Sequence, residues 1–156
     1  MSDHFKKGSI IAEQAYAQGK MIDHSSWGFA SNRTFSDVDA VFDNKGQLIY
    51  VEFARSDYPL SWDNISTGQR WLYKSMLENK KGSVAVLACH NVPSNQKIDS
   101  KTDITHASVV SCKFTAEISL DSTQYVQFVN LWDQSPKEAR AYICGIADAE
   151  QSGGDA

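Results

Sequence analysis

The sequence has no long apolar segment, few cysteines and no excess of positive charge. No apolar run approaches the roughly 18 to 20 residues needed to cross a bilayer, and polar residues interrupt the first 20 residues, where a signal peptide needs an apolar centre. We therefore expect a cytoplasmic protein that does not enter a membrane. The formal net charge of -4 disfavours a protein that coats nucleic acid unspecifically, because such binding depends on clustered lysine and arginine.

Cysteine and histidine are too scattered to indicate a structural zinc site. The three cysteines, Cys89, Cys112 and Cys144, are an odd number and lie in apolar surroundings. We interpret them as free thiols in or near the core. Neither they nor the four histidines show the close pairing that a structural zinc site requires.

Length and composition are those of an ordinary globular protein. The 156 residues are 42% hydrophobic and 22% charged, without an internal repeat or a linker. We expect one domain over residues 1–148 and a disordered tail over residues 149–156.

Basic residues are concentrated between Ile65 and Lys113, where seven basic residues stand against three acids. The seven are Arg70, Lys74, Lys80, Lys81, Lys97, Lys101 and Lys113. They form either a local basic face or scattered, solvated charges, and the sequence leaves both open.

The first half of the chain predicts the order helix, strand, strand, helix, strand. Ser9 and Gly19 delimit a helix over about residues 9–19. Strands over 34–43 and 47–54 are joined by the turn "DNKG", which predicts a β-hairpin because Asn and Gly accept positive φ.

A second helix is predicted over about residues 67–79, with Leu72 and either Met76 or Leu77 facing inward. The run "SVAVLACH", residues 83–90, is typical of a strand buried on both faces.

The second half of the chain carries weaker signals. Residues 91–106 are polar and predict a long loop, and "HASVVSCKFTAEI" predicts one further strand. Tyr125, Phe128, Val129 and Trp132 have the spacing of a buried helix face, in a helix that ends before Pro136.

An acid at the end of an apolar strand needs a physical reason, and Glu52 directly follows the apolar run ending at Val51. Alternation along a strand places Asp37 and Asp39 on one face, and Glu52 and Ala54 on one face of the next strand. If the hairpin brings these faces together, the acids converge on a point that suits Mg²⁺ or Mn²⁺. Alternatively, Asp37 and Asp39 only mark a solvated strand face.

The order of these parts resembles the PD-(D/E)xK nuclease superfamily, in particular small RecB-like, VRR-NUC-like or Holliday-junction-resolvase-like members. An acid and the "EFA" tripeptide on a hairpin are followed by a helix bearing "QRWLY". The resemblance covers roughly residues 9–90. It implies an α/β fold with the restriction-endonuclease-like αβββαβ core, in which helices flank a mixed central sheet.

The resemblance also implies a metal site for Mg²⁺ or Mn²⁺. Asp39 and Glu52 match the two acids, and Asp37 is the fallback for the first. The backbone carbonyl of Phe53 is expected to be a further ligand, and Glu13 resembles the extra helix acid of several small members. The alternative for Glu13, and the commoner role of such a residue, is a surface position on its helix.

Gln69 and Tyr73 match the Gln-x-x-x-Tyr motif, whose helix lies beside the active site and contacts the substrate. The cationic side chains Arg55, Arg70 and Lys74 are assigned to substrate binding as well. Each motif residue has a structural alternative, since Gln69 could close the helix start with Ser66 and Tyr73 could be a core aromatic.

Two tryptophans also have two interpretations. Trp62 and Trp71 could stack on bases or pack inside the protein. Packing is the commoner role of tryptophan.

Ala54 stands where the superfamily has the lysine that aligns and deprotonates the attacking water. Three explanations remain open. Ala54 could be an engineered replacement of lysine, which is the interpretation we favour, or the base could have moved to Arg55, Lys74 or another residue. Lastly, the chain could be a natural pseudo-nuclease.

The resemblance therefore implies a metal-dependent nuclease that is impaired by Ala54. DNA is the expected substrate rather than RNA, and branched, nicked or single-stranded DNA is the first choice. A homodimer is compatible with the small size. The alternative is a nucleic-acid-binding or inhibitory module that has kept the fold without the chemistry.

Overall fold

The computed structural model describes residues 38–111 and 116–153 of the chain. Of these, residues 38–91, 99–111 and 116–153 belong to one compact unit, and Val92–Ile98 is assigned to another. In Val92–Ile98, the N–H of Gln96 donates to the carbonyl of Pro93 at 3.0 Å and forms a turn. The prediction of one domain over residues 1–148 extends beyond the described residues and stays a prediction.

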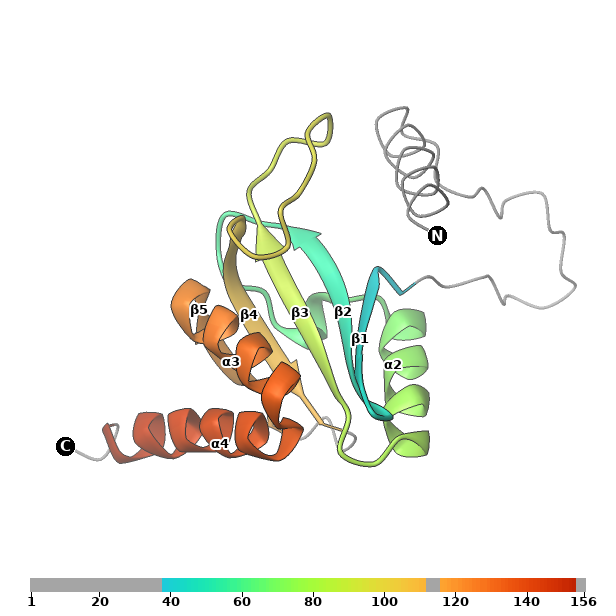
Figure 1. Ribbon diagram of the computed structural model, residues 1–156. Coiled ribbons are helices and arrows are strands. Elements are labelled where there is room, and N and C mark those ends of the chain that lie inside the picture. Colours follow the sequence, from blue (N-terminus) through green and yellow to red (C-terminus); the bar gives the residue numbers. More distant parts are fainter. Residues whose placement is uncertain (1–37, 112–115, 154–156) are drawn as a thin grey trace, which may run out of the picture. The chain divides into compact units, whose positions relative to one another are not determined.

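The larger unit is an α/β structure built on a five-stranded mixed sheet (Figure 1). The strands lie side by side in chain order, and only β2 and β3 are parallel to each other. They are β1 (Ala40–Asn44), β2 (Gln47–Arg55), β3 (Val84–His90), β4 (Ile104–Val110) and β5 (Ile118–Asp121). The described helices are the short 3-10 helix η1 (Trp62–Asn64), α2 (Thr67–Asn79), α3 (Ser122–Gln134) and α4 (Pro136–Gly153).

The predicted hairpin is confirmed, although the positive φ expected at Asn44 occurs at Lys45 instead. Lys45 and Gly46 form its two-residue turn with φ of 51° and 87°, and Asp43 Oδ1 accepts a hydrogen bond from the Gly46 N–H at 2.7 Å. Positive φ at both central residues is the geometry that matches the twist of the two strands. The ladder aligns Ala40 with Val51, so β1 starts at Ala40, and residues 34–37 of the predicted strand lie outside the described residues.

The predicted helix over residues 67–79 and the buried strand after it are also confirmed. Ser66 caps α2 by accepting the Gln69 N–H, and every residue of β3 is buried. Because α2 connects two parallel strands, it packs along one face of the sheet. Its buried residues are Tyr73 and Leu77, whereas Leu72 and Met76 are half-buried.

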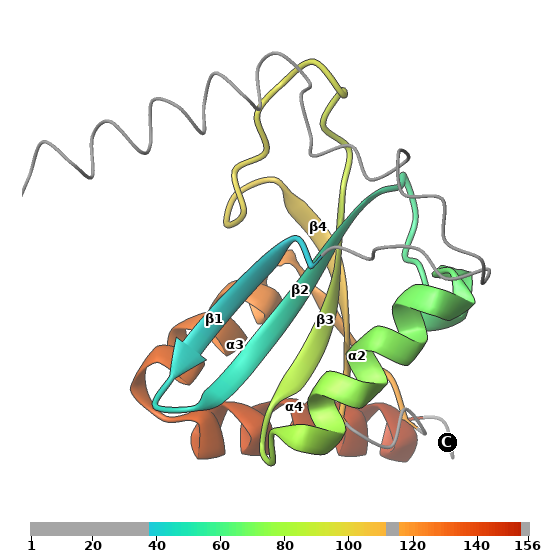
Figure 2. The ribbon, with the colours of Figure 1, turned by 90° about the vertical axis from the view of Figure 1, so that its right-hand side faces the viewer.

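Helices cover both faces of the sheet, α2 on one and α3 with α4 on the other (Figure 2). The core on the α2 side consists of Tyr50, Trp62, Tyr73, Leu77, Ala85, Leu87 and Val110. The core on the opposite side includes Ile49, Val51, Val86, Val109, Tyr125, Phe128, Trp132 and Ile143. The predicted buried face of the helix around Tyr125, Phe128 and Trp132 is thereby confirmed.

Several predictions for the second half were wrong. The single strand expected within residues 106–118 is two strands, β4 and β5, and β4 begins at Ile104 inside the predicted loop. Helix α4 was not predicted, and it continues to Gly153 where a tail from residue 149 was expected. Ala149, Glu150 and Gln151 favour helix, which explains this extension.

The cysteines differ in burial. Cys89 is buried, and burial raises the pKa of its thiol, as suits a core cysteine. Cys144 is exposed on α4, so its predicted place in the core was wrong. Cys112 lies outside the described residues.

Among the described residues, the structure contains no helix that is both long and apolar enough to pass through a membrane.

Candidate active site

Glu52 is near the end of β2 and faces α2. Along β2, Ile49, Val51 and Phe53 pack towards α3 and α4, while Tyr50 and Ala54 pack towards α2. Strand alternation therefore puts Glu52 on the α2 side, next to Ala54. The expected shared face of Glu52 and Ala54 is confirmed.

Two side chains of α2 converge on the Glu52 carboxylate. Gln69 Nε2 donates to Glu52 Oε1 at 2.9 Å, and the Tyr73 hydroxyl donates to Glu52 Oε2 at 2.6 Å. Gln69 and Tyr73 are four residues apart, so one helix face presents both donors. Each oxygen of the carboxylate thus has its own donor, which fixes the carboxylate plane.

Gln69 also takes part in the helix start. Its backbone N–H donates to Ser66 Oγ at 3.4 Å, and Ser66 Oγ donates to Gln69 Oε1 at 3.2 Å. The amide oxygen serves the cap while the amide nitrogen serves Glu52. The capping interpretation and the site interpretation of Gln69 are therefore compatible.

Tyr73 is fully buried, and its pKa is raised well above the usual value of a phenol. The largest cause is desolvation, followed by the hydrogen bond to Glu52 and by the negative charges of Glu52 and Asp39. The phenol therefore stays protonated at neutral pH and remains a hydrogen-bond donor to Glu52. Its packing in the core and its contact with Glu52 coexist.

Asp39 directly precedes β1 and lies beside the same stretch of β2. Its Oδ2 accepts a hydrogen bond from the Phe53 N–H at 2.8 Å. Since the N–H and C=O of one strand residue point to the same neighbouring strand, the Phe53 carbonyl is also directed to the edge where Asp39 lies. The Asp39 carboxylate and the Phe53 carbonyl thus lie at one edge of β2, while the neighbouring Glu52 carboxylate faces α2. The charges of both carboxylates act on Tyr73.

These groups are hard oxygen donors, the type that Mg²⁺ and Mn²⁺ prefer. A carboxylate has about four lone-pair positions, so donors on both oxygens of Glu52 are compatible with a metal ligand. No group of three or more His, Cys, Asp or Glu side chains suited to hold a metal occurs within the described residues. The oxygen donors near this end of β2 are the carboxylates of Asp39 and Glu52 and the carbonyl of Phe53.

The cationic candidates are not gathered around Glu52. Arg55 is exposed and, by strand alternation, lies on the opposite face of the sheet from Glu52. Arg70 forms an ion pair with Asp63 at 3.1 Å, and Lys74 is exposed on α2. Glu13 and Asp37 lie outside the described residues.

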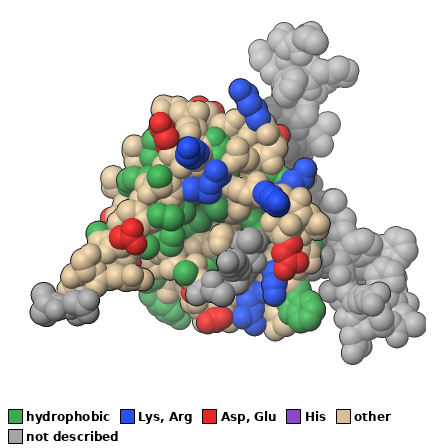
Figure 3. All heavy atoms as spheres, turned by 90° about the horizontal axis from the view of Figure 1, so that it is seen from below, with side chains coloured by type: hydrophobic (Ala, Val, Ile, Leu, Met, Phe, Trp, Pro, Cys, Tyr) green, Lys and Arg blue, Asp and Glu red, His purple; other side chains and the backbone are tan. Residues whose placement is uncertain are grey.

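The basic residues do not form a single face. Lys80 and Lys81 precede β3, whereas Lys101 follows its other end. On the face shown in Figure 3, blue Lys and Arg side chains are interspersed with red Asp and Glu side chains. The interpretation as scattered charges is therefore favoured on that face.

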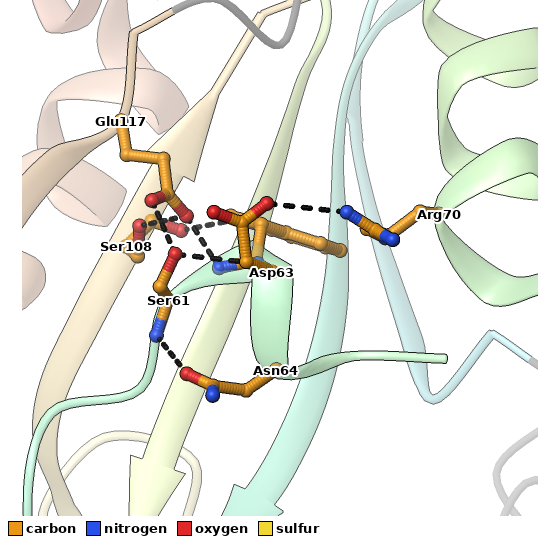
Figure 4. Close-up of polar contacts among 7 residues, drawn as sticks. Ser61, Asp63, Asn64, Arg70, Ser108 and Glu117 are labelled. Atoms are coloured by element: carbon orange, nitrogen blue, oxygen red, sulfur yellow. Dashed lines mark hydrogen bonds and ion pairs between the residues drawn. The ribbon is translucent and has the colours of Figure 1, made fainter. Parts of the chain in front are cut away.

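A polar cluster around η1 was missed by the sequence analysis (Figure 4). Glu117 accepts hydrogen bonds from Ser61 Oγ at 2.6 Å, from Ser108 Oγ at 3.3 Å and from the Trp62 N–H. The buried Trp62 ring donates from Nε1 to the Ser108 carbonyl at 3.0 Å. These bonds fasten η1 to β4 and to the residue before β5.

The same short helix is connected to α2. The Asp63–Arg70 ion pair joins η1 to the first turns of α2, which carry Gln69. The cluster thereby helps to set where α2 begins relative to the sheet. Ser61 and Asn64 form a capping box, and their spacing in "SWDN" was a signal for this element.

The two tryptophans have opposite environments. Trp62 is 2% exposed and packs edge-on against Tyr73 with ring centroids 5.1 Å apart, whereas Trp71 is 72% exposed. Packing is therefore confirmed for Trp62. Trp71 presents its ring on the outer surface of α2.

We expect Tyr73→Phe to lower the free energy of unfolding by about 1.5 to 3 kcal/mol, because it removes a hydrogen bond to a carboxylate inside the protein. Urea denaturation followed by circular dichroism measures this change. Tyr58→Phe is the matched control, since Tyr58 is 68% exposed and its change should stay within about 0.5 kcal/mol. Equal effects of the two substitutions would contradict a stabilising contact between Tyr73 and Glu52.

No family model matches the chain, and no curated protein or solved structure matches it.

Proposed function

We propose that the chain is a metal-dependent nuclease of the PD-(D/E)xK type that acts on DNA, in a form impaired by Ala54. The observation that carries the proposal is the convergence of Gln69 and Tyr73 on the Glu52 carboxylate. These two residues were selected from the sequence, by resemblance, as partners of the site to which Glu52 belongs.

The strand and helix order is compatible with the proposal. The hairpin of β1 and β2, the helix α2 and the parallel strand β3 follow one another as in the later part of an αβββαβ core. The helix predicted over residues 9–19 lies outside the described residues. The restriction-endonuclease-like core therefore remains part of the proposal.

In the proposed site, Asp39, Glu52 and the Phe53 carbonyl hold Mg²⁺ or Mn²⁺. The bound metal supplies polarisation of the phosphoryl group and activation of water. Gln69 and Tyr73 keep the Glu52 carboxylate in one orientation, as partners behind a metal ligand commonly do. A buried tyrosine that stays protonated is suited to this role over the whole neutral range.

Ala54 limits the chemistry of the proposed site. Its methyl group lies on the same side of β2 as Glu52, but it can neither orient a water molecule nor offset charge on a phosphate. A lysine at this position would provide a compact cation beside Glu52. We therefore propose that the chain binds metal and nucleic acid but cleaves poorly, whether Ala54 is engineered or natural.

Mn²⁺ binding, measured by isothermal titration calorimetry, tests the metal site. We expect one ion to bind, and Glu52→Gln and Asp39→Asn each to weaken its affinity at least 10-fold, because each removes a charged ligand. Asp148→Asn, an exposed acid on α4, is the matched control and should leave binding unchanged. Equal Mn²⁺ affinity in Glu52→Gln and in the unmodified chain would contradict the proposed metal site.

A second candidate function is favoured by the same alanine. A chain that never had the lysine could bind nucleic acid, or inhibit a partner, without cutting. Nucleic-acid binding by a chain whose Mn²⁺ binding does not depend on Glu52, and whose Ala54→Lys variant cuts no substrate, would support this module over the nuclease. Size-exclusion chromatography with light scattering would show whether either form acts as a homodimer.

A further inference from the structure

A polar cavity lies beyond the carboxyl ends of the two parallel strands. Its volume is about 370 Å³, and it is lined by Arg55, Ser56, Asp57, Tyr58 and Asn91. Arg55 ends β2 and is aligned with His90 at the end of β3. In open α/β sheets, the region outside the carboxyl ends of parallel strands is where ligands bind.

Arg55 gives this cavity an accessible cation. Within residues 38–111 and 116–153, no hydrogen bond or ion pair joins its exposed guanidinium to another residue. Its charge reaches His90, whose pKa is lowered mainly by burial and then by Arg55, against an opposing effect of Asp103. An exposed guanidinium without a protein partner is suited to a phosphate, which it can contact through two parallel hydrogen bonds.

Tyr58 gives the cavity an aromatic surface, and hydrogen bonds with Ser56 hold the backbone of Tyr58 in place. Ser56 Oγ donates to the Tyr58 carbonyl at 2.7 Å and accepts the Tyr58 N–H at 3.3 Å. The Ser56 N–H donates to the His90 carbonyl at 2.9 Å, which ties this turn to β3. The ring is 68% exposed, so the turn presents a flat apolar surface to solvent.

Resting on the proposed nuclease function, we infer that this cavity holds one unpaired nucleotide of the DNA substrate. The base stacks on Tyr58, and the phosphate contacts Arg55. Asp57 accepts, and Asn91 donates or accepts, hydrogen bonds at the edge of the base. An unpaired nucleotide is required because the base of an intact duplex has both faces covered by its neighbours.

Glu52 and Arg55 point to opposite faces of the sheet, so a strand that contacts both would pass around the carboxyl end of β2, where the cavity lies. Arg55 follows Glu52 by three residues, or about 10 Å of strand. The cavity would therefore hold a nucleotide near, but not at, the phosphate to be cut. This assigns the site to substrates with a single-stranded segment, such as a flap, a gap or a free strand.

Fluorescence anisotropy with a labelled 12-nucleotide single strand, in EDTA, tests the cavity without the metal site. Tyr58→Ala is expected to weaken binding about 5- to 100-fold, the effect of losing one stacked base. Tyr58→Phe keeps the ring and should bind within about twofold of the unmodified chain. Arg55→Gln should weaken binding and reduce the salt dependence by about 0.7 in the slope of log affinity against log salt.

Lys137→Gln is the control for a general loss of charge, because Lys137 is exposed on α4. The duplex of the same sequence should bind with the same affinity to all variants. Thermal melting confirms that each variant is folded.

Three results would overturn the inference. They are unchanged single-strand affinity in Tyr58→Ala, an equal loss for duplex and single strand, and no binding by the unmodified chain at about 100 µM, the weak end of unspecific binding. Competition by a mononucleotide at the same concentration as the 12-mer would assign a free-nucleotide site instead.

This experiment separates the cavity from the proposed function. If Glu52→Gln abolishes Mn²⁺ binding while Tyr58→Ala binds single strands normally, the nucleotide-binding role of the cavity is rejected and the proposed metal site is supported. If Tyr58→Ala loses single-strand binding while Mn²⁺ binding does not depend on Glu52, the nucleotide-binding role of the cavity is supported and the nuclease assignment is rejected.

Discussion

Ala54→Lys is expected to raise the rate of Mg²⁺-dependent DNA cleavage by about 100- to 10,000-fold, the usual contribution of a general base. Ala54 follows Glu52 by two residues on the face covered by α2. A lysine side chain starting there is long enough to reach past Glu52 to solvent, because its apolar stem can lie against the core while the ammonium stays wet.

The measurement is a cleavage assay on single-stranded, duplex and branched DNA and on RNA, each with Mg²⁺, Mn²⁺ or EDTA. Ala54→Met is the matched control, since it has a similar length without the charge and should cleave no faster than the unmodified chain. Adding Glu52→Gln to Ala54→Lys should abolish cleavage again. Activity that survives Glu52→Gln would point to a contaminating nuclease.

Failure of Ala54→Lys to cut any of these substrates, while it still binds Mn²⁺, would contradict the engineered-variant explanation. The pseudo-nuclease would then be the better description. A base moved to Arg55 is disfavoured, because Arg55 lies on the other face of β2 and guanidinium does not lose its proton at neutral pH.

Trp132→Ala is expected to lower the free energy of unfolding by about 3 to 5 kcal/mol, the range for removing a large buried aromatic side chain. Trp132 is 0% exposed and packs edge-on against Phe128, with ring centroids 5.7 Å apart. Its Nε1 donates to the Gln47 carbonyl at 3.1 Å, and the Arg140 guanidinium lies 5.7 Å from its ring centroid. The ring therefore joins α3 and α4 to the start of β2.

Urea denaturation with circular dichroism measures this loss. Trp71→Ala removes the same side chain from an exposed site, where 72% of the residue is in contact with solvent, and should change stability by less than about 0.5 kcal/mol. Trp132→Phe keeps most of the packing and should fall between the two. A loss below about 1 kcal/mol for Trp132→Ala would contradict the packing of α3 on the sheet.

The elements that sequence reasoning predicted are those with strong local signals. The turn between β1 and β2 contains Gly46, α2 has Ser66 as its cap, and β3 is a continuous apolar run. Each of these signals acts over a few residues, so no distant part of the chain is needed to recognise it.

The missed elements lacked such signals. No glycine or proline separates β4 from β5 in the sequence, and apolar residues continue through the connection. The sequence pattern therefore predicted a single strand instead of two. Helix α4 has a weak apolar stripe, interrupted by Gly145, and it starts at Pro136, where the preceding helix was expected to end. Proline is well suited to the first turn of a helix. Pro136 therefore follows the end of α3 and is also the first residue of α4.

The candidate site was predictable in part. Strand alternation gave the common face of Glu52 and Ala54, whereas the roles of Gln69 and Tyr73 came from resemblance. The contact between Glu117 and Trp62 was not predicted, because the two residues are 55 positions apart in the chain and no local sequence pattern indicates it.

The two-residue turn at Lys45 and Gly46 has a consequence for how this protein can vary. The turn sets the register of β1 against β2, and this register places Asp39 beside Phe53. Phe53 follows Gly46 by seven residues. Because side chains alternate, one inserted residue would move Asp39 by about 3.3 Å and turn it to the opposite face. The turn should therefore tolerate no change of length, and Gly46 should be kept because few residues other than glycine adopt its positive φ. Two residues that never contact the site thus fix where Asp39 lies in it.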